Sequence, residues 1–150
     1  MGTGVYQQDH GKAFEFFNRG AELGSIRAHY TLAMSYEHGV FIEKDMGRAI
    51  NHYKSAAIRG HEGARYNLGI IEEQKGSFVQ AFKHFMMAAR SGDEDSLKKV
   101  GEGYKAGRVT KDEYASTLRA HKVTRDEMKS EQRTKAWEMM AKRDSSLQSS

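Results

Sequence analysis

The sequence predicts an all-α fold: an α/α superhelical solenoid of paired antiparallel helices with a C-terminal capping or extended helix. A helix ending recurs three times as an aromatic residue, a small pair and a glycine, in 17–24, 53–60 and 85–92, with glycines 36 and 32 residues apart. Only 38% of the 150 residues are hydrophobic, which suits an array whose helix pairs contact only their neighbours. The chain has no proline, the commonest helix breaker.

Two helix types alternate along the chain. Residues 1–11 lack periodicity and are glycine-rich, so we expect a flexible N-terminal lead. From Lys12 onward, apolar and small residues recur at i, i+3, i+4, i+7 and i+8, which predicts an amphipathic helix closed by Gly24. Similar patterns predict first-type helices at 26–38, 62–75 and 94–105 and second-type helices at 12–22, 47–58, 78–91 and 111–120.

Residue size explains how these helices pack. Small side chains at equivalent positions of successive units let two helices approach closely, and large side chains fill the space between them. Each buried large side chain contributes about 1.5–3 kcal/mol. The small positions are Ala28, Ala64 and Ser96, with Ala33, Gly69 and Gly101; the large ones are Leu32, Leu68 and Val100, with Phe17, Tyr53 and Phe85.

The C-terminal part has two helix-start signals. Thr110 to Glu113 and Thr124 to Glu127 both match the capping box, in which a threonine and a glutamate cap the same helix reciprocally. We therefore expect the repeat array to span 12–120, a separate C-terminal helix to span 121–142, and a serine-rich tail at 143–150 to be disordered.

Residues 28–60 resemble the Sel-one-like repeat, a relative of the tetratricopeptide repeat. The matching residues are Ala28, Leu32, Tyr36, Gly39, Val40, Asp45, Arg48, Ala49, Tyr53, Ala56, Ala57 and Gly60. Ala33 replaces the usual glycine, and one loop glycine is missing. A second unit at 64–92 keeps most of the pattern with a shorter loop, and a third at 96–120 is degenerate.

The resemblance implies a non-enzymatic adaptor or scaffold that binds a protein or peptide partner. In such arrays the first-type helices line a concave groove. The inward positions would be Tyr30, Met34 and Glu37, then Tyr66, Ile70 and Glu73, then Lys98, Glu102 and Lys105. The alternative is that Tyr30, Tyr66 and Ile70 only pack between neighbouring units. The helix at 12–22 has no first-type partner, which suggests a fragment or a shortened relative of a longer array.

An accessory surface is expected on the C-terminal helix. Arg125, Lys129 and Arg133 recur at i, i+4 and i+8 and could meet phosphates or an acidic partner, although a solvated helix face is the simpler interpretation. Trp137, with its neighbouring methionines, would either pack back on the array as a cap or form a small docking patch.

No catalytic, metal or cofactor site is predicted. The chain lacks cysteine, and His52 and His84 occupy equivalent helix positions without a second ligand at i+4. The glycine-rich segment 101–107 has one residue too many for a dinucleotide fingerprint and no preceding strand.

Charge leaves two alternative functions open. The net charge of +4 allows a helical-repeat RNA binder that uses Lys98, Lys105 and the Arg125 ridge, but interleaved acidic residues count against nucleic acid. A self-associating structural fragment is the other alternative, and the sequence does not fix the oligomeric state. No signal peptide or long apolar run is present, so we expect a cytoplasmic protein without a membrane partner.

Overall fold

The computed structural model describes residues 3–148, with side chains described from Asp9 onward, and helices joined by short turns and loops make up that range. The helices are α1 (Thr3–Glu22), α2 (Ile26–His38), α3 (Met46–Ile58), α4 (Glu62–Gln74), α5 (Phe78–Arg90), α6 (Glu94–Lys105) and α7 (Lys111–Gln148). The predicted all-α fold is confirmed. Each of α2 to α6 begins and ends within one residue of its predicted range.

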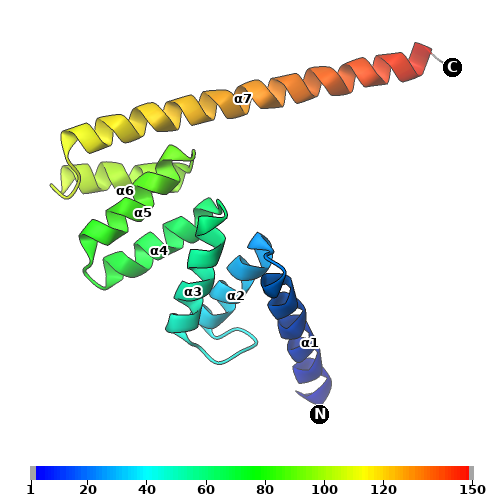
Figure 1. The fold of residues 1–150 in the computed structure, drawn as a ribbon, viewed down its shortest axis with the longest axis vertical. Coiled ribbons are helices and arrows are strands. Elements are labelled where there is room, and N and C mark those ends of the chain that lie inside the picture. Colours follow the sequence, from blue (N-terminus) through cyan, green and yellow to red (C-terminus); the bar gives the residue numbers. More distant parts are fainter. Residues whose placement is uncertain (1–2, 149–150) are drawn as a thin grey trace.

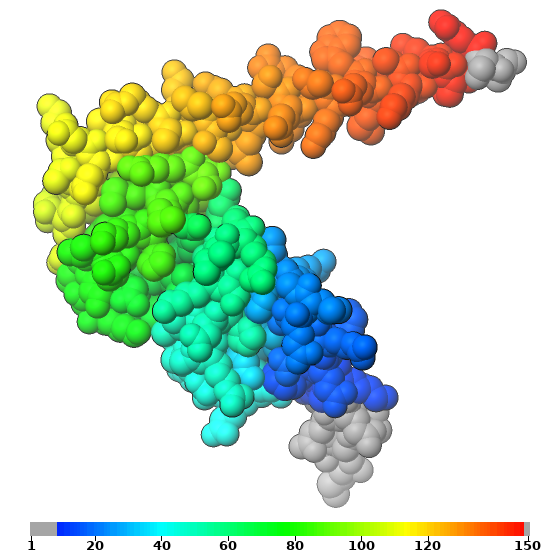
Figure 2. Space-filling view, viewed as in Figure 1, coloured from blue at the N-terminus to red at the C-terminus, as the bar shows by residue number. Residues whose placement is uncertain are grey.

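The helices stack in chain order (Figure 1). Each of α1 to α6 packs against the next helix along the chain, and α7 packs against both α5 and α6. The second half of α7 then projects away from the stack, and the space-filling view shows a wide hollow between it and the N-terminal helices (Figure 2).

The three repeated glycines occupy the same structural position. Gly24, Gly60 and Gly92 have φ values of 84°, 97° and 104°, a left-handed conformation that glycine adopts without steric cost. After each glycine, the next backbone amide donates a hydrogen bond of 2.9–3.1 Å to the carbonyl five residues earlier. This is the Schellman ending of a helix, so the recurring sequence pattern marks a recurring chain reversal.

The residue after each glycine also starts the next helix. Ser25, His61 and Asp93 each accept a hydrogen bond through the side chain from the amide three residues later, at 3.2, 3.0 and 2.8 Å. These contacts satisfy one of the free amides at the helix N-terminus. Each turn into a first-type helix is therefore built in the same way from three different residue types.

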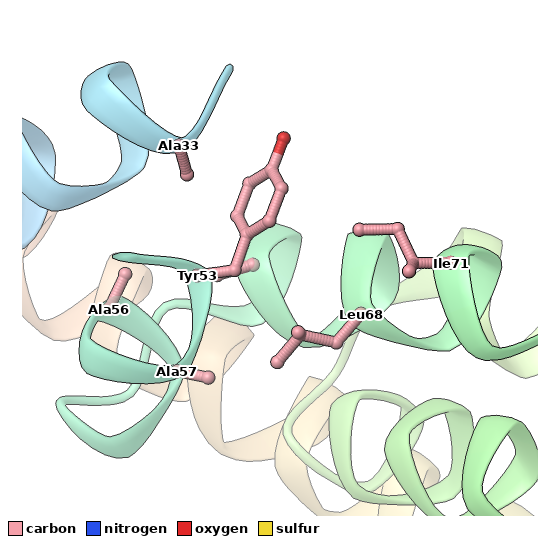
Figure 3. Packing of buried hydrophobic residues seen from close by; sticks show 7 residues of the cluster. Ala33, Tyr53, Ala56, Ala57, Leu68 and Ile71 are labelled. Atoms are coloured by element: carbon pink, nitrogen blue, oxygen red, sulfur yellow. The ribbon is translucent and has the colours of Figure 1, made fainter. Parts of the chain in front are cut away.

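The core lies between successive helix pairs. Figure 3 shows Tyr53 of α3 and Leu68 of α4 among the small side chains Ala33, Ala56 and Ala57. Tyr53 is completely buried, and Leu68 is 2% exposed. A second cluster of the same kind surrounds Phe85, and a third surrounds Leu32. These clusters confirm the predicted pairing of small and large positions.

The N-terminal prediction needs correction. Residues 3–11, expected as part of a flexible lead at 1–11, belong to α1. Gly4 and Gly11 each disfavour a helix by only about 1 kcal/mol, and the segment contains no proline to break one. Met1 and Gly2 lie outside the described residues.

The C-terminal prediction also needs correction, because α7 is a single helix. The capping box at Thr110 is confirmed: the Thr110 amide donates to the Glu113 carboxylate at 2.8 Å, and the Glu113 amide donates to the Thr110 hydroxyl at 3.1 Å. Thr124 starts no helix; its hydroxyl donates to the Arg90 carbonyl at the end of α5, at 2.7 Å. The tail predicted as disordered continues the helix to Gln148, and the last two residues lie outside the described part.

Candidate functional site

In the first unit, the predicted groove residue Tyr30 joins two units. Its ring stacks on His61 at a centroid distance of 4.2 Å, and its hydroxyl accepts a hydrogen bond from the Asn67 side chain at 3.4 Å. His61 and Asn67 belong to the cap and body of α4. Tyr30 is therefore partly buried and links α2 to α4.

Met34 differs from Tyr30, since its side chain is 39% exposed. It lies on a shallow hollow of about 300 Å³ at the surface of α2. The residues that line this hollow are Tyr30, Thr31, Met34, Ser35, His38 and Val40. The hollow is open, mostly apolar, and large enough for one side chain of a partner.

Glu37 serves the interior of the first unit. Its carboxylate accepts a hydrogen bond from the hydroxyl of Tyr53, the tyrosine at the centre of the first core cluster. Burial, together with the neighbouring Glu37 charge, raises the pKa of the Tyr53 phenol. A substitution at Glu37 that removes the carboxylate would therefore take a hydrogen-bond acceptor from this phenol.

In the second unit, all three predicted residues contact the neighbouring elements. Tyr66 and Ile70 pack against the core cluster around Phe85, with the Tyr66 and Phe85 rings 5.7 Å apart. Glu73 forms an ion pair of 2.7 Å with Lys99 of α6. That hydrogen bond raises the pKa of the Lys99 ammonium group. These contacts hold α4 to α5 and α6.

In the third unit, Lys98, Glu102 and Lys105 are exposed along α6. They lie at an open hollow of about 410 Å³ between α6 and α7. The remaining lining residues are Glu94, Leu97, Gly101, Tyr114 and Leu118.

The predicted groove residues therefore fall into two groups. Met34, Lys98, Glu102 and Lys105 are exposed beside hollows. The other five make contacts within or between units, and for Tyr30, Tyr66 and Ile70 this packing is the alternative that the sequence left open. Partner binding by any of the nine stays a prediction.

The residues of the predicted accessory surface also fall into two groups, one at the docked part of α7 and one on its projecting part. Arg125 is half-buried and lies 3.4 Å from the Glu94 carboxylate, where α7 rests on the start of α6. Lys129 and Arg133 are exposed on the projecting half of α7. Trp137 is 71% exposed, which contradicts the first of its two expected roles, a cap packed back on the array, while the docking patch stays a prediction.

Sequence analysis missed the residues that dock α7. His121 is buried; its Nδ1 lies 2.9 Å from the Ala89 carbonyl and its Nε2 lies 3.2 Å from the Glu94 carboxylate. Together with the Thr124 hydroxyl, it contacts the last carbonyls of α5. A histidine within a polar helix gives no sequence signal of such a contact.

His52, which the sequence analysis compared with His84, lies against a different histidine. His52 contacts His29 of α2, with the two Nδ1 atoms 3.1 Å apart. This distance requires at least one of the rings to be neutral, because one nitrogen must accept. Burial lowers the pKa of each ring. Among the described residues, no group of three or more histidines or carboxylates is placed to hold a metal ion.

No helix within residues 3–148 combines the length and the apolar character needed to cross a bilayer.

Comparison with known proteins places this geometry among helical repeats. Over 74 residues, this chain is 34% identical to chitin synthase regulatory factor 4 of Schizosaccharomyces pombe. The matched stretch covers 49% of this chain and 12% of that protein. A protective antigen of uropathogenic Escherichia coli with an SLR fold superposes with a TM-score of 0.62 and 28% identity, over 77% of this chain and 26% of the antigen.

A Sel1 repeat protein from Oxalobacter formigenes superposes with a TM-score of 0.60 and 28% identity, over 64% of this chain and 40% of that structure. The chain thus spans less than half the length of each of these relatives.

The family comparison assigns the repeats. The Sel1 repeat model matches residues 1–25, 26–61 and 63–93, more than half of the chain. The first match includes α1, which the sequence left without a partner helix, and the degenerate unit expected at 96–120 lies beyond the last match. The chain belongs to the Sel1 repeat family.

Proposed function

We propose that this chain is a non-enzymatic adaptor that binds a protein partner along the face formed by α2, α4 and α6. Sel1 repeat proteins are typically interaction modules without catalytic activity. The curated relative that shares about half of this chain is named as a regulatory factor of chitin synthase, which is consistent with a protein partner.

One observation carries the proposal: exposed side chains remain beside hollows at both ends of this face. Met34 offers an apolar contact at α2. Lys98, Glu102 and Lys105 offer charges of both signs at α6. Because Met34 and Glu102 occupy the same position in the first and third units, an extended partner segment could contact both ends. Methionine suits such a surface, since its flexible side chain adapts to different partners.

The structure also decides which substitutions can test this proposal. Changing Glu37, Glu73 or Tyr66 would remove contacts to Tyr53, Lys99 or Phe85, so that lost binding could reflect lost packing. Met34→Asp combined with Glu102→Lys changes only exposed side chains. A matched control is Val79→Asp with Glu15→Lys, which makes the same changes in charge at exposed positions of α5 and α1.

The test is quantitative affinity capture from the native cell with the full chain and both double variants. We expect at least one partner to be reduced about tenfold or more by Met34→Asp with Glu102→Lys and to be retained by the control, with equal urea unfolding midpoints for all three proteins. Partners that remain fully bound to the first variant would contradict the proposed face.

A further inference from the structure

The projecting half of α7 is a surface separate from the face of α2, α4 and α6. The last side chain of α7 near the array is Met128, whose sulfur lies 3.3 Å from the position that a Cβ on Gly92 would occupy. From Lys129 to Gln148 every side chain is exposed. At 1.5 Å per residue, these 20 residues form a helix about 30 Å long. Figures 1 and 2 show this part of α7 projecting from the stack.

Cationic and apolar side chains share one face of this segment. We call it the arginine stripe; its members, spaced alternately four and three residues apart, are Lys129, Arg133, Ala136, Met140, Arg143 and Leu147. This spacing keeps all six on one side of a helix. Met140 is 59% and Leu147 66% exposed. The stripe holds three cations and no acid.

Two of the three acids of the segment face away from the stripe, and the third, Asp144, lies at its edge beside Arg143. Glu131 precedes Lys135 by four residues, and Glu138 precedes Lys142 by four, on the opposite side of the helix. Such pairs stabilise a helix by a few tenths of a kcal/mol each. Neither Arg133 nor Arg143 has an acidic residue three or four positions away. Neither lies in an ion pair within residues 3–148.

A second copy of the chain does not fit the stripe. In an antiparallel pair centred on the stripe, Arg133 of one copy would face Arg143 of the other, twice. In a parallel pair, each of the three cations would face its own copy. Like charges placed opposite each other across a helix pair are destabilising, so neither orientation is favoured.

We propose that the arginine stripe docks an acidic amphipathic helix of a protein partner. Glutamate or aspartate side chains of that helix would pair with Lys129, Arg133 and Arg143, and its apolar side chains would pack on Ala136, Met140 and Leu147. Helix-in-groove recognition uses anchors at this spacing, and charge complementarity selects the partner. Trp137, adjacent to the stripe, would lose solvent contact on docking.

Trp137 is the only tryptophan of the chain, so it reports on this surface directly. The probe is a synthetic 21-residue helical peptide with leucine at the a and d positions of each heptad and glutamate at the flanking e and g positions. A second peptide carries glutamine in place of every glutamate. Titration into the full chain at low salt, followed by tryptophan emission, is expected to give a blue shift with the acidic peptide and at least tenfold weaker binding with the glutamine peptide.

Two charge-matched variants locate the contact. Arg133→Gln with Arg143→Gln removes two charges from the stripe, and Lys135→Gln with Lys142→Gln removes two from the opposite face. We expect the first pair to weaken binding of the acidic peptide about tenfold and the second to weaken it less than threefold. Circular dichroism checks that both variants keep the helix content of the wild-type chain.

Each contrary result overturns the proposal. Absence of binding by the acidic peptide, equal binding by the glutamine peptide, or equal weakening by the two variants would exclude charge-directed docking on the stripe. Tighter binding of oligouridylate RNA or of phosphatidylserine vesicles, with the same sensitivity to Arg133→Gln and Arg143→Gln, would replace the protein helix by a phosphate-bearing ligand. The Met34→Asp and Glu102→Lys double variant should still bind the acidic peptide. Loss of binding at the arginine stripe can therefore be told apart from loss of binding at the face of α2, α4 and α6.

Discussion

At the scale of single residues, Gly69 sets the distance between α4 and α5. A Cβ atom at this position would lie 2.5 Å from the Phe85 ring, closer than atoms approach in packed proteins. Phe85 is completely buried, and its ring cannot move aside without disturbing the second core cluster. The glycine that the repeat pattern places after the leucine therefore has a packing role within the helix.

Gly69→Ala is expected to lower the free energy of unfolding by about 1–3 kcal/mol, because the added methyl group overpacks the site. Gly11→Ala in α1 is the control: nothing lies within 4 Å of its Cβ position, so the higher helix propensity of alanine should stabilise the chain by up to about 1 kcal/mol. Urea unfolding followed by circular dichroism measures both. A neutral Gly69→Ala would contradict the close approach of α4 to Phe85.

At the scale of elements, α7 is held at its start and along its first half. The reciprocal bonds between Thr110 and Glu113 fix its N-terminus. His121 and Thr124 then attach it to the carbonyl end of α5. The projecting half, from Lys129 to Gln148, is exposed along its whole length and continues a helix that these residues have already formed, which avoids the unfavourable step of helix nucleation.

Thr110→Ala is expected to destabilise the chain by about 1 kcal/mol, since it removes the hydroxyl that accepts from the Glu113 amide. Thr134→Ala makes the same chemical change within the exposed half of α7, where alanine is the better helix former, and should not lower stability. Differential scanning calorimetry of the two variants provides the comparison. Equal losses would show that the cap contributes nothing beyond local helix propensity.

At the scale of the whole molecule, partly buried histidines recur along the array from α2 to α5. His29, His52, His61 and His84 are all partly buried, and burial is the largest cause that lowers the pKa of each. His61 also needs an unprotonated Nδ1 to accept from the Ala64 amide. A lowered pKa in the folded state means that unfolding takes up protons as the pH falls.

We therefore expect the stability contributed by these histidines to be complete above pH 6.5 and to be lost as the pH falls below that value, through the lowered pKa values of the folded state. The melting temperature should be lower at pH 5 than at pH 7.5. His52→Asn should reduce this difference, because it removes one ring of the pair with His29. An unchanged melting temperature across this range would contradict neutral histidines in the fold.

The sequence alone determined the repeating part of this protein. The glycines at 24, 60 and 92, the alternation of small and large side chains and the absence of proline are local signals, and each acts within one helix pair. They predicted α2 to α6 and their packing, because in an array every contact lies close in the sequence. The missed turn caps, such as His61, use side chains that several residue types can replace.

Only the tertiary structure decided that α7 is one continuous helix and which of the predicted groove residues are exposed. Thr124 matches a helix-start signal, but its hydroxyl donates a hydrogen bond to the carbonyl of Arg90, which lies 34 residues away in sequence. The helix therefore continues through Thr124. Likewise, Ile70 and Met34 occupy equivalent face positions, yet Ile70 packs on the next unit and Met34 stays exposed. Periodicity fixes which way a side chain points; whether a neighbour covers it depends on contacts between elements.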